Sequence, residues 1–114
     1  MHRRHRLKRS ADFQRVRALK QSWAHPLMVL YVAPNGLQVT RAGIAVGKRI
    51  GKAVARNRAK RLIREAIRNY LPSLPAGFDL VLIARAPMAG AGYHEVLRAT
   101  ELLLRRARLL GESS

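Results

Sequence analysis

The stretch from Gly47 to Tyr70, GKRIGKAVARNRAKRLIREAIRNY, decides how the rest of the chain is interpreted. Its apolar residues recur at three- and four-residue spacing, which predicts a helix from about Ala53 with one side on a core. These apolar residues are Ala59, Leu62, Ile63, Ala66, Ile67 and Tyr70. The opposite side is basic, and Glu65 is the only acid in the helix. Because a solvated helix face normally mixes charge signs, we expect this face to meet a polyanion.

The first turns of this helix carry Arg56 and Arg58, although the helix dipole disfavours cations there. Free backbone N–H groups also point out of that end, which makes it a natural place for an anion. Gly47 and Gly51 precede the helix without the Gly-Lys-Ser/Thr ending of a nucleotide-binding loop, so we interpret them as turn residues.

The composition favours the same kind of partner. The chain has 114 residues, enough for one domain with its own core, and 23 Lys and Arg against 6 Asp and Glu give a net charge of +17. Such a charge repels itself unless a polyanion neutralises it, and nucleic acid is the leading candidate. A membrane surface is a weaker candidate, because the basic amphipathic segments are also needed for the core.

Several classes of site and location are excluded or disfavoured by what the chain lacks. It has no cysteine, so disulfides and thiolate metal sites are excluded. The basic N-terminus is not followed by the apolar segment of a secretory signal, and the longest apolar runs are far too short to span a bilayer. We therefore expect a cytoplasmic protein.

The domain organisation predicted from the sequence is a mobile basic arm over residues 1–9, one RNA-binding domain over residues 10–111 and a tail over residues 112–114. Within the domain we expect a helix over about 11–19 capped by Ser10, a brief strand over 22–24, strands over 27–33 and 41–46, the basic helix, a strand over 78–84, and a helix over 93–110 capped by Gly111.

The connections between these elements suggest their pairing. The turn Pro34-Asn35-Gly36 predicts an antiparallel hairpin between the strands over 27–33 and 41–46. Strand, helix and strand over 41–84 predict a βαβ unit, and the nearly unbroken apolar run over 78–84 predicts an interior strand. The sum is a two-layer α+β sandwich.

The apolar faces follow from spacing. In the first helix, Phe13, Val16 and either Leu19 or Lys20 should face inward. The strand over 27–33 has two apolar faces, so both should be at least partly covered. One face carries Leu27, Val29 and Tyr31, and the other carries Met28, Leu30 and Val32.

Catalytic chemistry is not visible in the sequence. The six acids are spread over separate elements, and His25 and His94 have no partner motif. No acid–base pair or metal-ligand spacing emerges, so the residues predict a binding protein without a catalytic centre.

The motif Arg56-Asn57-Arg58, followed by Lys60-Arg61 and Arg64, resembles the signature of the bacterial ribonuclease P protein subunit. The resemblance continues in order over residues 6–110. Its other parts are Arg6-Leu7 with Asp12-Phe13 and Val16, then Arg41-Ala42-Gly43, then the stretch from Gly47 to Val54, and finally the strand from Asp79 to Ala84-Arg85.

The resemblance implies a fold like the second domain of ribosomal protein S5, with the order α-β-β-β-α-β-α and a left-handed βαβ crossover. It also implies a protein subunit that binds the catalytic RNA and the 5′ leader of precursor tRNA. The RNA would then remove the leader with Mg²⁺, which the protein side chains would not hold alone, and no protein partner would be required.

Carried over residue by residue, the resemblance implies two surfaces. The RNA-binding surface would comprise Lys48, Arg49, Lys52, Arg56, Asn57, Arg58, Lys60, Arg61, Arg64 and Arg68. The leader-binding cleft would comprise Phe13, Arg17, Val29 and Tyr31, although plain core packing is the alternative for Phe13 and Tyr31.

Two residues depart from the family pattern. Arg17 stands where the family often has a second aromatic residue, and Lys20 stands where it often has glycine. Leader binding would then depend more on charge and less on stacking.

Three other functions remain open at this point. A ribosomal protein of the same fold would bind ribosomal RNA without raising cleavage by any RNA. A protein-only nuclease would cleave without RNA, and a general nucleoid binder would not distinguish duplex DNA from structured RNA.

Overall fold

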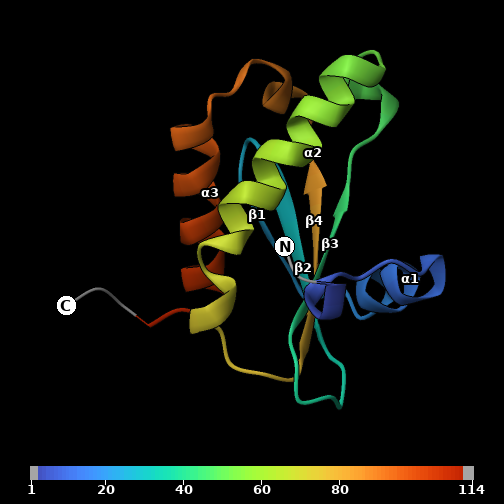
Figure 1. The fold of residues 1–114 in the computed structure, drawn as a ribbon, viewed down its shortest axis with the longest axis vertical. Helices are drawn as coiled ribbons and strands as arrows, with labels where there is room; N and C mark the ends of the chain where they lie inside the picture. The colour runs from blue at the N-terminus through green and yellow to red at the C-terminus, as the bar shows by residue number, and fades with distance from the viewer. Residues whose placement is uncertain (1–2, 112–114) are drawn as a thin grey trace.

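The computed structural model describes residues 3–111, and there a four-stranded sheet carries α-helices on both faces (Figure 1). The elements are α1 (Ser10–Ala18), β1 (Ser22–Ala24), β2 (Met28–Pro34), β3 (Arg41–Ala45), α2 (Ala53–Arg68), β4 (Phe78–Ala84) and α3 (Tyr93–Arg106). Short 3₁₀ turns include η1 (Arg3–His5) and η2 (Lys48–Ile50). The predicted order α-β-β-β-α-β-α is confirmed.

The strand order β1-β2-β4-β3 places β4 inside the sheet, as its apolar run predicts. β4 pairs antiparallel with β2 and parallel with β3, with Leu82 opposite both Leu30 and Ile44. The predicted hairpin between β2 and β3 is therefore wrong. The turn at residues 34–36 does reverse the chain, but β2 and β3 lie on opposite sides of β4, because the most apolar strand takes the central position where both its edges are paired.

The predicted βαβ unit is confirmed, since β3 and β4 are parallel and α2 connects them. In Figure 1 both strands point upward, α2 lies in front of the sheet and β4 lies to the left of β3. The crossover is therefore left-handed, against the usual rule for parallel strands.

The main core lies between the sheet and the layer formed by α2 and α3, which confirms the two-layer sandwich. Its largest fully buried side chains include Leu30 and Leu82 from the sheet, Ile63 and Ile67 from α2, and Leu103 from α3. The two helices contact one another, so together they cover this face.

The opposite face of the sheet is covered only in part, by α1. Val16 of α1 is buried with Leu7, Ala33 and Val81 in a second, smaller apolar cluster. Tyr31 is half-buried against that cluster. Both faces of β2 are thus at least partly covered, as expected.

The inner side of α1 is shorter than its spacing predicts. Val16 is fully buried and Phe13 is half-buried, but Leu19 is 49% exposed and Lys20 is exposed. The expectation for Leu19 or Lys20 is wrong because the helix ends at Ala18, and Lys20 then has φ 59°, which turns the chain toward β1.

The caps of two helices also differ from expectation. Ser10 is the first residue of α1 and not its cap; Arg9 is the N-cap, with extended backbone. At the end of α3 the chain turns at Arg108, which has φ 61°. The predicted cap was Gly111, three residues later. At the turn, the N–H of Leu109 donates to the carbonyl of Leu104 at 2.9 Å, and the early turn buries Leu109.

The segment before α1 packs on the domain in the residues that the structure describes, so its separation as an arm needs correction. The N–H of Leu7 donates to the carbonyl of Ala42 at 2.9 Å, and Arg6 bridges the same residue of β3. Because Leu7 is buried, residues 3–9 contribute to the smaller core. Residues 1–2 and the predicted tail 112–114 lie outside the described residues.

Candidate nucleic-acid interface

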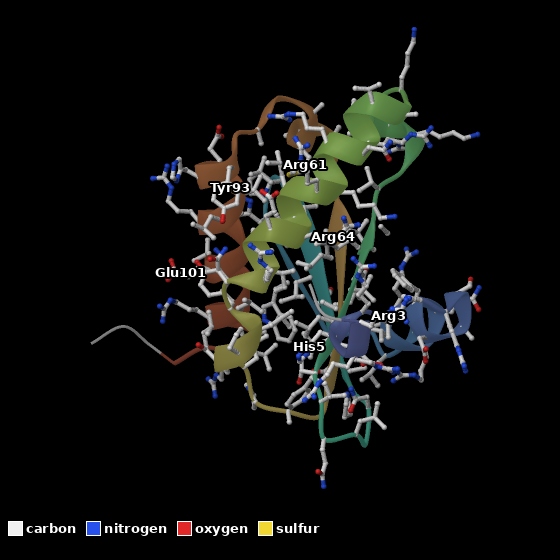
Figure 2. The ribbon with its side chains drawn as sticks, viewed as in Figure 1. Arg3, His5, Arg61, Arg64, Tyr93 and Glu101 are labelled. Carbon is white, nitrogen blue, oxygen red and sulfur yellow. The ribbon has the colours of Figure 1, made fainter. Side chains whose placement is uncertain are left out.

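The outer side of α2 is basic because the apolar residues from Ala59 onward face the core, whereas Val54 in the first turn is exposed. Ala59, Leu62, Ile63, Ala66 and Ile67 are buried, as predicted. The side chains that follow the same spacing on the other side are Lys60, Arg61 and Arg68, all exposed, and Arg64, which is half-buried. Figure 2 shows Arg61 and Arg64 on the outer side of the helix.

The segment before α2 extends this basic surface. Lys48 and Arg49 lie on η2 and Lys52 is the N-cap residue of α2; all three are exposed. Ile50 is buried and holds the segment on the core. Gly51 has φ 135°, a backbone conformation that favours glycine, which agrees with the turn role predicted for it.

The signature residues Arg56, Asn57 and Arg58 do not share one environment. Asn57 is exposed, whereas Arg56 is half-buried, and its Nε has no hydrogen-bond partner among residues 3–111. Arg58 donates from its guanidinium to the carbonyl of Ala91 at 2.8 Å. Arg58 therefore ties α2 to the segment before α3, a structural contact that the sequence motif does not reveal.

The predicted cleft residues lie on the α1 face of the sheet, but α1 runs across that face and divides them. Phe13 lies over β3, so close that a Cβ built on Gly43 would be 2.4 Å from the tip of the Phe13 ring. The guanidinium of Arg17 lies 5.8 Å from the centre of the Tyr31 ring on β2. A hollow lined by Arg17, Tyr31 and Lys20 opens at the end of α1.

Beyond α1 the sheet has one apolar row that is only half-buried among residues 3–111. Val29 pairs with Ile83, and Ile83 with Ala45, so these three half-buried side chains form a row across β2, β4 and β3. We refer to Val29, Ile83 and Ala45 as the open row. Val29 lies two residues before Tyr31 on β2, and side chains alternate between the two faces of a sheet, so the open row lies on the same face as Tyr31.

A cationic hollow adjoins the open row at the carboxyl ends of β3 and β4. It is lined by Ile83, Lys48, Arg49 and Arg85 among others. Ile83 and Arg85 were missed as site residues from sequence, since the apolar run of β4 does not say which face of the strand stays uncovered. Their neighbours across the sheet depend on register, and only the register brings Ile83 beside Val29.

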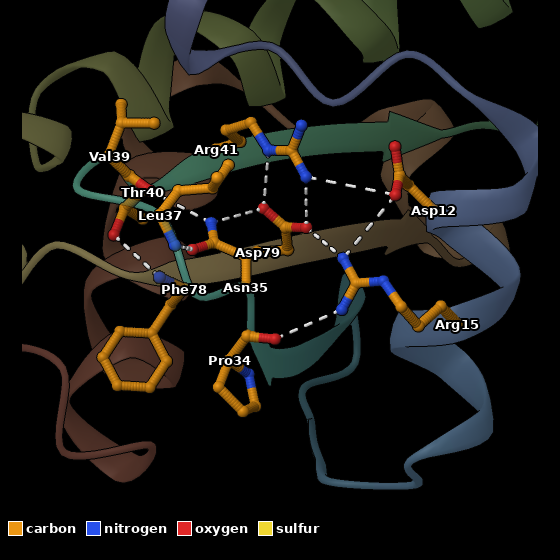
Figure 3. Close-up of polar contacts among 10 residues, drawn as sticks. All are labelled: Asp12, Arg15, Pro34, Asn35, Leu37, Val39, Thr40, Arg41, Phe78 and Asp79. Carbon is orange, nitrogen blue, oxygen red and sulfur yellow. Dashed lines mark hydrogen bonds and ion pairs between the residues drawn. The ribbon is translucent and has the colours of Figure 1, made fainter.

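A buried carboxylate holds α1 in place (Figure 3). Asp79 is fully buried and accepts hydrogen bonds from Arg41 (2.7 and 2.9 Å), from Asn35 (2.9 Å) and from Arg15 of α1. We call these four residues the Asp79 clamp. Because Arg15 comes from α1 and the other three residues from the sheet and its β2–β3 turn, the clamp fixes the position of α1 on the sheet.

The ionisation of Asp79 fits this role. Burial alone would raise the pKa of Asp79, but hydrogen bonds from Arg41 and Asn35, the charge of Arg41 and the hydrogen bond from Arg15 outweigh burial and hold the pKa below its usual value. Sequence reasoning counted Asp79 among the scattered acids. Its partners are 38 to 64 residues away in the chain, so no local pattern could have found them.

The histidines and acids do not assemble into a metal site within residues 3–111, where no three His, Asp or Glu side chains lie close enough together to hold an ion. His25 is used structurally: its Nδ1 accepts from the N–H of Leu27 at 3.0 Å. Burial and the charge of Arg106 lower the pKa of His25. Among the described helices, none is both long and apolar enough to cross a bilayer.

The sequence of this chain is similar to those of known proteins. Residues 1–108 match the family described as Ribonuclease P. The chain is 42% identical over 107 residues to the ribonuclease P protein component of Caldanaerobacter subterraneus, a match that covers 94% of this chain and 92% of that protein. It is 42% identical over 109 residues to the one from Herpetosiphon aurantiacus, covering 96% and 89%.

Solved structures agree with these relatives. The fold superposes on the RNase P protein of Staphylococcus aureus with a TM-score of 0.86 and 33% identity, over 94% of this chain and 98% of that one. It also resembles the RNase P protein of Thermotoga maritima in complex with 1-(4-fluorophenyl)-2-thiourea, with a TM-score of 0.76 and 33% identity, over 88% and 98%.

Proposed function

This chain belongs to the ribonuclease P protein family, and we propose that it binds both the catalytic RNA and the 5′ leader of precursor tRNA. The ribonuclease P protein component is part of an endoribonuclease holoenzyme with a role in tRNA 5′ processing. In our proposal, α2 and the segment before it bind the catalytic RNA, and the open row with its neighbours binds the leader.

The observation that carries the proposal is the outer side of α2. Lys60, Arg61, Arg64 and Arg68 have no side-chain hydrogen bond or ion pair within the part of the chain that the structure describes. Cations that are left unpaired along one helix are suited to a row of phosphates. Arg58 is less free, because it bonds to Ala91, and we assign it a positioning role as well.

The leader site rests on the open row and the residues beside it. An apolar floor next to Tyr31 suits the faces of unpaired bases, and base stacking on an aromatic ring is worth about 1–3 kcal/mol per base. Arg17 already lies over the Tyr31 ring, so a base would either displace it or stack on the guanidinium plane. Lys48, Arg49 and Arg85 would bind phosphates at the far end of the row.

Magnesium belongs to the RNA in this proposal. The described side chains do not fit a metal site of their own, since no three potential ligands lie together. Mg²⁺ would supply activation of water and charge stabilisation at the cleaved phosphate. What this chain would add is binding and orientation of the two RNAs.

The first test is cleavage of a precursor tRNA at low Mg²⁺ by bacterial ribonuclease P RNA with this protein, without it, and by the protein alone. We expect cleavage only when both components are present. No stimulation at any Mg²⁺ concentration would favour a ribosomal or general RNA-binding protein. Cleavage by the protein alone would mean a protein nuclease and would overturn the proposal.

The second test separates the two surfaces. Arg61→Ala with Arg64→Ala should weaken assembly with the catalytic RNA, whereas Tyr31→Ala should weaken binding of leader-bearing tRNA and leave mature tRNA unchanged. Tyr93→Ala, another half-buried tyrosine but on α3, is the matched control for Tyr31. Equal loss for both tRNA forms with Tyr31→Ala would count against a leader site there.

A further inference from the structure

Three hollows lie in a row along the free edge of β3. The middle hollow is lined by Arg6, Lys8, Phe13, Lys60, Arg64 and the backbone segment Ala42 to Ile44. It shares Arg6 and Lys8 with a hollow toward the β2–β3 turn and shares Lys60 with a hollow beside Arg56 and Asn57. Because neighbouring hollows share lining residues, they form one groove, which we call the edge groove.

The walls of the edge groove are cationic on both sides. Arg6 and Lys8 come from the segment before α1, and Lys60 and Arg64 come from α2. No Asp or Glu lines the middle hollow. Within residues 3–111, none of these four side chains makes a hydrogen bond or ion pair, so their charges are available to a ligand.

The floor of the groove is an edge strand. β3 pairs on one side with β4, and on its other side the backbone of residues 3–111 bonds to it only at Ala42, through Arg6 and Leu7. A bare strand edge can also pair with a protein strand. The four cations of the middle hollow, which has no acid in its lining, fit the phosphates of a nucleic acid better, because a peptide would need an acid for nearly every residue to match them. Asp12 lines only the hollow toward the β2–β3 turn.

Phe13 and α1 separate the edge groove from the open row. Phe13 lies over Gly43 at the β3 edge, whereas the open row lies on the sheet face beyond α1. The edge groove is continuous instead with the outer side of α2 through Lys60 and Arg64. A strand in the groove would therefore belong to the RNA that binds α2.

We propose that the edge groove binds a strand of the catalytic RNA through its phosphates, with Arg6 and Lys8 as the contacts opposite α2. This inference rests on the proposed function, since it assumes that α2 binds that RNA. It makes the segment before α1 part of the RNA interface, in addition to its contribution to the smaller core. The strand would lie between two walls of cations, one from the segment before α1 and the other from α2.

The test is the affinity of Arg6→Ala with Lys8→Ala for bacterial ribonuclease P RNA over a series of salt concentrations. The buried Leu7 and its hydrogen bond to Ala42 stay in place, so the segment should remain folded. The matched control is Arg98→Ala with Arg108→Gly, which removes two exposed arginines of the α3 region. Glycine is used at position 108 because φ is 61° there.

We expect the Arg6 and Lys8 variant to bind the RNA at least tenfold more weakly than wild type. The slope of log affinity against log salt should fall by about 1.4–1.8, the value for two lost phosphate contacts. The preference of the assembled complex for leader-bearing over mature tRNA should be unchanged. The control should retain both the affinity and the slope of wild type.

Three outcomes would overturn the inference. Equal loss in the control would mean a general charge effect. Loss confined to leader-bearing tRNA would assign the groove to the leader. Unchanged RNA affinity, with an acidic peptide bound instead, would assign it to a protein. If wild type and the Arg61→Ala with Arg64→Ala variant bound the RNA equally, the proposed function itself would fail.

Discussion

The two faces of the sheet are held by different forces. On one face, α2 and α3 bury a large apolar cluster that includes Ile63, Leu82 and Leu103. On the other, the nine-residue α1 buries one valine and is tied down by the Asp79 clamp. A helix this short is marginal alone, so its position depends on tertiary contacts.

The difference explains how one small sheet can serve two surfaces. The α2/α3 layer is stabilised by apolar area on its inner side, which leaves its outer side free to carry unpaired charge. The α1 face uses directional ion pairs, so one short helix is enough and the open row stays uncovered. A full helix layer on that face would bury the floor that we assign to the leader.

Removing the carboxylate of the clamp should have one of the two largest effects, together with truncation of the main core. Asp79→Ala leaves Arg15 and Arg41 facing each other with only Asp12, at 3.7 and 4.0 Å, as a counter-ion, and breaking a buried pair costs about 3–5 kcal/mol. We expect a loss near the lower end, since both guanidinium groups reach solvent, measured by urea unfolding. Glu101→Ala, which breaks a half-exposed pair with Arg105 at 3.0 Å, should cost no more than about 1 kcal/mol. Similar losses of unfolding free energy in both variants would mean that the Asp79 clamp stabilises the protein no more than a half-exposed ion pair does.

Truncation in the main core should have the other large effect. Ile63→Ala removes a fully buried side chain and should cost about 2–5 kcal/mol by urea unfolding. Val16→Ala, the matched change in the α1 cluster, should cost less, because it removes fewer methyl groups from a smaller cluster. An equal cost for Val16→Ala and Ile63→Ala would mean that apolar burial stabilises both faces of the sheet to the same extent, against the contrast drawn above.

The clamp should also give the stability a pH dependence. The folded-state pKa of Asp79 is depressed, so its contribution is fully present above the unfolded pKa of about 3.9 and is lost as pH falls through the folded value. The loss should be smaller than in Asp79→Ala, because a protonated carboxyl still accepts hydrogen bonds. Urea midpoints measured downward from about pH 6 should fall more steeply for wild type than for Asp79→Asn. Parallel curves would show that Asp79 does not titrate below its usual pKa.

A smaller effect is expected where α1 meets β3. Gly43→Ala forces the Phe13 ring to move, and overpacking of this kind costs about 1–3 kcal/mol. The cost should be at the low end because the ring tip can swing aside, and the Phe13 ring resonances should shift in NMR spectra. Gly47→Ala is the control, since nothing lies within 4 Å of its Cβ position. Unchanged Phe13 resonances would contradict the close approach.

The smallest effect should be a gain. Lys20 has φ 59°, where glycine avoids a cost of about 1 kcal/mol, so Lys20→Gly should raise the urea midpoint slightly. Arg108→Gly tests the same backbone cost at the end of α3, where φ is 61°. A loss of stability in Lys20→Gly alone would mean that the Lys20 side chain stabilises the α1 face.

The elements themselves were largely predictable because they are encoded by local spacing. The 3.6-residue period of α2 identified its five buried residues, and the apolar run of β4 identified the central strand. The prediction of strand pairing failed, because the turn at residues 34–36 and the apolar run of β4 favoured different partners for the same strands. The turn at residues 34–36 predicted a hairpin, but β4 pairs with both β2 and β3, so its apolar run has both edges paired.

The basic outer side of α2 was predictable in the same way, from spacing along the chain. Charge patterning along α2 indicated its outer side, and the family resemblance supplied Phe13, Arg17, Val29 and Tyr31, whose roles stay predictions. The contacts of Arg58 with Ala91 and of Asp79 with Arg15 could not be predicted, because they join residues far apart in the chain. The RNA-binding role of Arg58 stays a prediction.

By itself the sequence determined the helices and strands, the α+β class, the net charge of +17 and the basic side of α2, because periodicity and charge are local properties of a chain. Only the tertiary structure decided the strand order, the Asp79 clamp, the open row and the edge groove. Each of these depends on which strands pair and in what register, and that choice is made by the free energy of the whole core.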